Sequence, residues 1–137
     1  MVQRLRGWGW RLGLVGALEM SAFSGNCAFA QSNIVADDTL GAENSVVVRD
    51  FNGLPVEVIQ GGAARGQNLF HSFLEFNVDA NRGAYFFSPA DIQNILARVT
   101  GGSPSKILGT LGTFGDSTPN LFLTHIPQMW LEIFHQL

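Results

Sequence analysis

Short apolar runs, separated by glycine, asparagine and proline, set the strongest limit on how this chain can fold. The runs occupy residues 46–48, 56–59, 69–78, 84–87, 106–111 and 121–123. Short runs between turn-forming residues are typical of β-strands. Helices of globular proteins are longer and repeat apolar residues every three or four positions. The sequence therefore predicts an all-β domain.

Two of these runs are predicted to form a hairpin over residues 45–60. Asn52-Gly53 lies between them, and both residue types tolerate the positive φ angles of a tight turn. The longest run, 69–78, has large apolar side chains at both odd and even positions. This pattern predicts a strand that is covered on both faces.

The best local helix signal lies between residues 88 and 102. Ser88 suits an N-cap, Pro89 suits the first helical position, and Gly101-Gly102 suits a stop. Residues 98–100, however, favour an extended backbone. We therefore expect a short helical turn over about 89–95, followed by a strand.

Composition and charge exclude several classes of function. The 137 residues carry a formal net charge of −3, so no basic surface for nucleic acid is expected. One cysteine and three scattered histidines cannot supply an internal disulfide or a usual zinc site. Asp37, Asp38 and Asp79 lack the spacing of a calcium loop and are expected to be solvated turn carboxylates. No metal or cofactor is predicted.

Catalytic motifs of the common hydrolases, zinc proteases and nucleotide-binding loops are absent from the sequence. His71, Ser72 and Glu75 are the residue types of a nucleophilic triad, but they crowd one predicted strand. Side chains alternate along a strand, so His71 and Ser72 are expected on opposite faces. The chain is therefore predicted not to be an enzyme, and His71 is predicted to be structural.

Residues 1–30 have the pattern of a secretory signal peptide. Three arginines precede a mostly apolar stretch over residues 12–23, and Ala28-Phe29-Ala30 supplies a small-residue cleavage site at Ala28 and Ala30. The apolar stretch is shorter than the roughly 20 residues that a membrane-spanning helix needs. The pattern predicts export through the inner membrane.

Residues 33–123 resemble the N-terminal haemagglutination-activity, or two-partner secretion, domain of filamentous-haemagglutinin-like exoproteins. The segments that carry this resemblance most specifically are Asn68-Leu69-Phe70-His71-Ser72-Phe73, Phe76-Asn77-Val78 and Arg98-Val99-Thr100-Gly101-Gly102. The resemblance implies a right-handed parallel β-helix with N-terminal capping strands, over residues 31–123. It also implies that these segments serve as a folding template or in recognition by a transporter.

Members of that family are addressed to a dedicated outer-membrane transporter, whose POTRA modules recognise them in the periplasm. The resemblance therefore implies transport through the outer membrane, after which the protein is secreted or stays at the cell surface. Pairing of a sheet edge with a transporter strand is a hypothesis for the mode of capture. The haemagglutination name offers an alternative, a carbohydrate-binding adhesin in which exposed Tyr85, Asn81 and Arg82 contact a glycan.

Residues 124–137 depart from the family pattern. The expected N-P-N-G-I motif is missing, and the tail has the character of an out-of-frame translation, which predicts a truncated β-helix from a frameshifted gene. Alternatively, residues 129–137 form an amphipathic cap, because their apolar residues follow helical spacing. These residues are Trp130, Ile133, Phe134 and Leu137.

Overall fold

The structure is a computed structural model that describes residues 32–127. The predicted signal peptide, its cleavage residues Ala28 and Ala30, and the predicted cap over residues 129–137 lie outside the described residues. Between residues 32 and 127, no helix is long and apolar enough to cross a membrane.

The all-β prediction is confirmed for the described residues. Apart from turns and connections, they contain strands and two single-turn 3-10 helices, η1 (Gly41–Glu43) and η2 (Phe51–Gly53). The strands are β1 (Asn33–Ala36), β2 (Ser45–Val48), β3 (Val56–Gly61), β4 (Ala63–Arg65), β5 (Asn68–Asn77), β6 (Gly83–Ser88), β7 (Asn94–Val99), β8 (Thr110–Gly115) and β9 (Asn120–His125).

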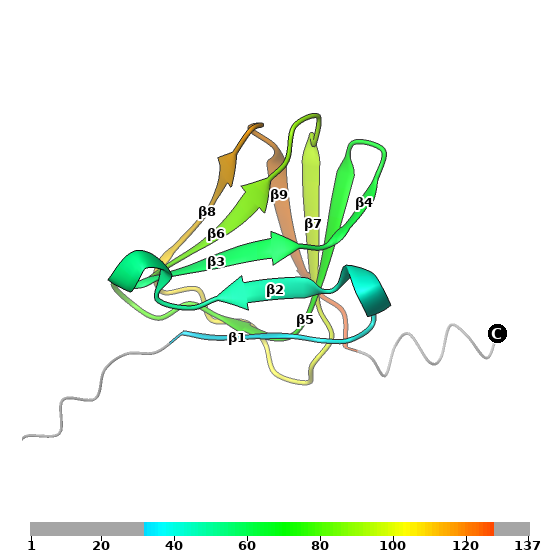
Figure 1. The fold of residues 1–137 in the computed structure, drawn as a ribbon. Helices are drawn as coiled ribbons and strands as arrows, with labels where there is room; N and C mark the ends of the chain where they lie inside the picture. Colours follow the sequence, from blue (N-terminus) through cyan, green and yellow to red (C-terminus); the bar gives the residue numbers. More distant parts are fainter. Residues whose placement is uncertain (1–31, 128–137) are drawn as a thin grey trace, which may run out of the picture.

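The strands form two mixed sheets, and from β5 to β9 the chain alternates between them (Figure 1). In one sheet β5, β7 and β9 are parallel, and β1 and β4 pair antiparallel with β5. In the other sheet β3, β6 and β8 are parallel, and β2 pairs antiparallel with β3. Paired positions are 26 residues apart between β5, β7 and β9, and 27 residues apart between β3, β6 and β8. Neither sheet closes on itself.

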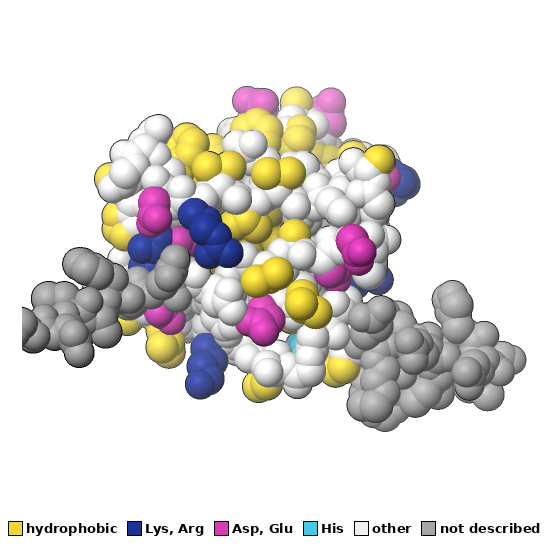
Figure 2. All heavy atoms as spheres, turned by 60° about the horizontal axis from the view of Figure 1, so that its bottom comes forward, with side chains coloured by type: hydrophobic (Ala, Val, Ile, Leu, Met, Phe, Trp, Pro, Cys, Tyr) yellow, Lys and Arg dark blue, Asp and Glu magenta, His cyan; other side chains and the backbone are white. Residues whose placement is uncertain are grey.

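The hydrophobic core lies between the two sheets. Phe76 stacks on Phe86 with ring centroids 5.8 Å apart, and Phe73 meets Phe76 edge to face at 5.0 Å. Ile59 and Ile95 fill the space beside these rings and have no solvent exposure. On the face that Figure 2 shows, apolar side chains also reach the surface among acidic and basic ones.

The predicted hairpin is confirmed. Val48 pairs with Val58 and Ser45 with Gly61 in the antiparallel β2–β3 ladder. Asn52 and Gly53 both have positive φ angles, 54° and 74°, as the sequence of the turn predicts.

The prediction that the strand at 69–78 is covered on both faces is wrong. Phe70 and Leu74 are 37% and 45% exposed. The ladder between β1 and β5 shifts register at Leu74, because Val35 pairs with Glu75 whereas Ala36 pairs with Phe73. This β-bulge lets Phe73 and Phe76 both face the core although they are three residues apart.

The predicted helical turn over residues 89–95 is also wrong. Residues 90–91 form a turn in which Asp91 has a φ of 67°, and the strand that follows, β7, begins at Asn94. Ser88 ends β6, is completely buried, and bonds through its hydroxyl to Ser117 Oγ instead of capping a helix. The backbone amides of residues 93 and 94 both donate to Gln67 O, so hydrogen bonds to the turn between β4 and β5 decide the conformation here.

The strand predicted at residues 106–111 begins later than expected. Ile107 forms only an isolated bridge with Val78, and β8 starts at Thr110. Gly109 lies against the backbone of the preceding turn, where a Cβ atom would come within 2.1 Å of Arg82 O. This close approach lies directly before Thr110, where β8 begins.

Candidate functional site

The family-like segments of β5 and β7 divide their side chains between the core and the outer face of the β5-β7-β9 sheet. Leu69, Phe73, Phe76, Val78 and Val99 are buried in the core. Leu96 and Arg98 alternate with buried core residues of β7 and are half-buried, and Phe70 is exposed. One sequence segment therefore holds the fold together and also forms a surface.

His71 is a buried core residue. Its side chain is 1% exposed, its ring packs edge to face on Phe86 at 5.2 Å, and its Nδ1 lies 2.9 Å from Ser45 Oγ. Its Nε2 has no hydrogen-bond partner among the described residues. Burial lowers the pKa of His71 to about 4, because no group offsets the loss of hydration of the imidazolium ion.

His71 and Ser72 point to opposite sides of β5, as predicted from strand geometry. His71 lies among core rings, whereas Ser72 Oγ bonds to Asp37 Oδ2 at 2.8 Å. Gly62 packs so closely on β5 that a Cβ atom would come within 2.7 Å of Phe70 O. Ser72 therefore lies out of reach of the His71 imidazole, whose Nδ1 contacts the buried Ser45 hydroxyl instead.

Asp37 joins the N-terminal segment to both family-like segments. Its Oδ1 accepts hydrogen bonds from the backbone N and the Oγ1 of Thr39, at 3.1 and 2.6 Å. Its Oδ2 accepts hydrogen bonds from Ser72 Oγ at 2.8 Å and from Thr100 Oγ1 at 2.7 Å. The prediction that Asp37 is a solvated turn carboxylate is therefore wrong, whereas Asp38 is exposed as expected.

Arg98 completes this group, which we call the Asp37 cluster: Asp37, Thr39, Ser72, Arg98 and Thr100. Arg98 donates from Nε to Ser72 Oγ at 2.9 Å and from Nη2 to Thr39 Oγ1 at 2.7 Å. Burial raises the pKa of Asp37, but the hydrogen bonds that its carboxylate accepts outweigh this effect and hold the pKa below its usual value. The carboxylate is therefore charged at neutral pH. The Asp37-x-Thr39 spacing of an Asx turn was the available sequence signal.

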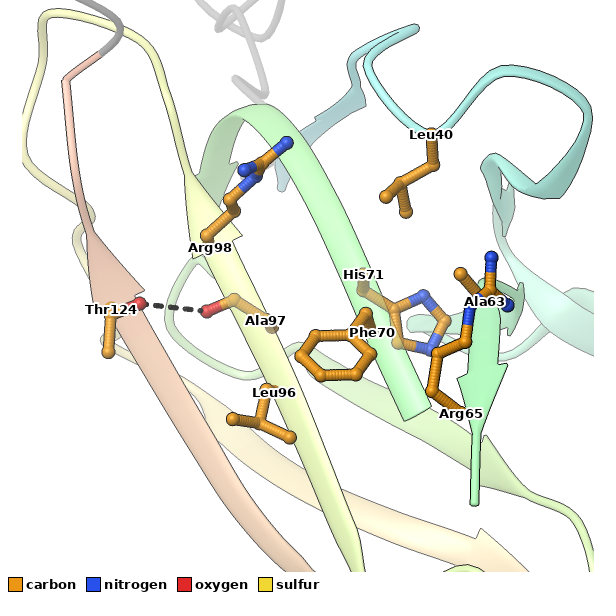
Figure 3. Close-up of a pocket in the computed structure, with 9 residues that line it drawn as sticks. All are labelled: Leu40, Ala63, Arg65, Phe70, His71, Leu96, Ala97, Arg98 and Thr124. Atoms are coloured by element: carbon orange, nitrogen blue, oxygen red, sulfur yellow. Dashed lines mark hydrogen bonds between the residues drawn. The ribbon is translucent and has the colours of Figure 1, made fainter. Parts of the chain in front are cut away.

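A groove lies on the outer face of the β5-β7-β9 sheet, beside β4 (Figure 3). Phe70, Leu96 and Leu40 supply much of its apolar lining, and the guanidinium groups of Arg65 and Arg98 lie along it. Its volume is about 410 Å³. The groove can accept an apolar group that carries a negative charge.

An amide ladder runs across the same sheet. Asn94 Nδ2 donates to Asn68 Oδ1 at 3.0 Å, and Asn120 Nδ2 donates to Asn94 Oδ1 at 3.2 Å. The three asparagines occupy equivalent positions of β5, β7 and β9. Such stacked amides stabilise parallel strands that lie in register.

The remaining residues of the family-like segments are placed by backbone contacts. Gly101 packs on β5, where a Cβ atom would lie 2.1 Å from Leu74 O, whereas nothing lies within 4 Å of a Cβ at Gly102. Asn77 Oδ1 accepts a hydrogen bond from the backbone N of Lys106 at 3.0 Å. Both contacts hold the segment between β7 and β8 against β5.

Asn81, Arg82 and Tyr85, the candidate glycan contacts, line one depression of about 450 Å³. The side chain of Arg82 is only 13% exposed and forms ion pairs with Glu57 and Asp50, so the expectation of an exposed Arg82 is wrong.

Within residues 32–127, no group of three His, Cys, Asp or Glu side chains could hold a metal ion.

A comparison with protein-family models supports the family resemblance that these segments indicate. No curated protein and no solved structure matches the chain. The family model described as TPS secretion domain matches residues 32–124, more than half of the chain. The predicted resemblance is thereby confirmed, and the chain belongs to the family of two-partner secretion (TPS) domains.

Proposed function

We propose that residues 32–124 are the secretion signal of an exoprotein, recognised by the POTRA modules of its outer-membrane transporter, and that they then form the first coils of a right-handed parallel β-helix. Membership of the TPS family makes the chain a two-partner secretion substrate. The regular offsets of 26 and 27 residues between parallel strands support the β-helix. The predicted signal peptide would take the chain through the inner membrane.

The difference between the two ends of the strand stack carries this proposal. At the β1 end, Arg49 donates from Nη2 to Ile34 O at 2.9 Å and from Nη1 to Ser32 O at 3.3 Å. These carbonyl groups are therefore already occupied and are not free to pair with another strand. At the other end, β8 and β9 are the outermost strands of their sheets and are each six residues long. The edges of β8 and β9 therefore suit the addition of strands better than the four-residue edges of β1 and β2.

The hydrogen-bond ladder identifies the free groups of β8. Thr110 N donates to Arg82 O and Asp116 N donates to Ser88 O, both in the preceding coil. Because amides alternate in direction along a parallel strand, the amides of Leu111 and Thr113 point away from β6. We propose that a strand of the transporter first pairs with this edge, and that the next coil of the exoprotein replaces it.

The test is a secretion assay in a Gram-negative host that expresses the partner transporter. Thr113→Pro removes an amide that β6 does not use, so we expect it to block release while the chain still reaches the periplasm. Thr113→Ala is the matched control and should be released like the parent chain. Circular dichroism of both purified variants checks that they fold alike. Equal release of the two variants would contradict capture at the β8 edge.

A carbohydrate-binding adhesin is the second candidate function. It is favoured by one observation, the depression in which Tyr85 lies with Asn81, since an aromatic face beside an amide suits a sugar ring. A glycan array with the purified chain separates the two candidates. A secretion signal alone predicts no glycan binding, whereas an adhesin predicts binding that Tyr85→Ala removes.

A further inference from the structure

The outer face of the β5-β7-β9 sheet exposes an apolar stripe. Phe70, Leu96 and Phe122 occupy paired positions of β5, β7 and β9. Phe70 is 37% and Phe122 is 49% exposed, although large aromatic side chains favour burial. The stripe continues into the groove that Leu40 and Thr124 also line (Figure 3).

The charged side chains that line this groove are both basic. Arg65 and Arg98 line it, and no carboxylate does. Arg65 forms an ion pair with Glu43, which leaves it 63% exposed, whereas Arg98 forms no ion pair with a carboxylate of residues 32–127. An occupant that combines apolar side chains with a negative charge therefore suits the groove better than a neutral or basic one.

Residues 128–137 combine these properties. This segment contains one acidic residue, Glu132, and no lysine or arginine. Its six apolar residues are Met129, Trp130, Leu131, Ile133, Phe134 and Leu137. We propose that residues 128–137 dock on the Phe70–Leu96–Phe122 stripe, with Glu132 facing the arginines of the groove.

The path of the chain makes this contact short. Ile126 N donates to Val99 O at 2.8 Å, and His125 Nε2 lies 2.7 Å from Gly101 O, so the chain leaves β9 beside the end of β7. Thr124, four residues before the segment begins, already lines the groove. Adjacent strands are about 4.8 Å apart, so the stripe spans about 10 Å. Ten residues span about 15 Å even as a helix.

Trp130 provides the readout. The chain has three tryptophans, and replacing Trp8 and Trp10 with phenylalanine leaves Trp130 as the one indole. In this parent chain we expect the Trp130 emission to lie to the blue of its value in urea, with acrylamide quenching below that of the unfolded chain. Docking places the indole against apolar side chains and out of water.

Two substitutions locate the docking surface. Phe70→Lys and Phe122→Lys lie at opposite ends of the stripe, and each should shift the Trp130 emission and quenching towards the unfolded values. Phe114→Lys is the matched control, because Phe114 is 41% exposed on the edge strand of the other sheet. It should leave the Trp130 signal unchanged, and circular dichroism confirms that all three variants keep their strands.

If residues 128–137 do not occupy the stripe, the same measurements give different results. Trp130 emission that already equals the unfolded value, or that ignores Phe70→Lys, overturns the proposal. A signal that responds to Leu111→Asn but not to Phe70→Lys would place the segment on the open end of the stack instead. A blue shift that disappears on dilution would assign the stripe to a second copy of the chain.

Discussion

The buried imidazole of His71 makes the stability of this domain depend on pH between about 4 and 6.5. Burial lowers its pKa from 6.5 to about 4, whereas in the unfolded chain the imidazole is hydrated and binds a proton more tightly. At pH values between about 4 and 6.5, the His71 side chain therefore binds more protons in the unfolded state than in the folded state. The free energy of unfolding must therefore fall as the pH falls through this window.

The size of the effect follows from the shift. At about 1.4 kcal/mol per pKa unit, a shift from 6.5 to about 4 corresponds to roughly 3 kcal/mol in total. About 2 kcal/mol of this is lost between pH 7 and pH 4.5. A domain of this size has a stability of about 5–15 kcal/mol, so the loss is large enough to measure. The pKa of Asp37 lies below 3.8, so this carboxylate titrates under the window.

Urea unfolding followed by circular dichroism at several pH values between 7 and 4.5 measures this loss. His71→Phe is the comparison, because phenylalanine keeps a ring against Phe73 and Phe86 and does not titrate. Its unfolding free energy should change by less than about 0.5 kcal/mol over the same range. If His71→Phe does not fold, His71→Asn replaces it. An equal loss in parent and variant, or no loss in the parent, would refute the role of His71.

Three further pairs of variants test the packing of the domain by urea unfolding at pH 7. Gly101→Ala should destabilise by about 2–3 kcal/mol, because its Cβ would lie 2.1 Å from a backbone oxygen of β5, whereas Gly102→Ala meets nothing within 4 Å and should stay within about 0.5 kcal/mol of the parent. Asp37→Asn should cost about 2 kcal/mol through weakened charge-assisted hydrogen bonds, and Asp38→Asn, on an exposed residue, should not. Glu57→Ala removes the buried partner of a mostly buried guanidinium, which then keeps only the exposed Asp50, and should cost about 2–3 kcal/mol, whereas Glu43→Ala, from an exposed ion pair, should unfold close to the parent.

Sequence reasoning succeeded where the decisive interactions are local. The β2–β3 hairpin depends on Asn52-Gly53, two residues whose positive φ angles are set by their own chemistry, and on the valines beside them. The opposite orientation of His71 and Ser72 follows from strand alternation alone. Neither feature needs knowledge of a distant partner.

The errors occur where a distant segment decides the local structure. The bulge at Leu74 follows from the pairing of β1 with β5, which the apolar pattern of β5 does not contain. At Asp91 the chain turns and continues into β7, because hydrogen bonds to Gln67 O, in the turn before β5, outweigh a favourable local helix signal. The sequence pattern predicts a solvated Asp37, because the hydroxyl groups that bond to it lie 35 and 63 residues away.

The position of the family-like segments between core and surface determines what a secretion assay can reveal. Charge placed at Leu69 or Phe73 enters the core and unfolds the domain, so loss of secretion would say nothing about recognition. Phe70 and Leu74 lie in the same strand but reach solvent. Substitutions there change the surface and leave the core intact. A recognition surface on β5 is therefore testable only at the exposed positions, and with a folding measurement on each variant.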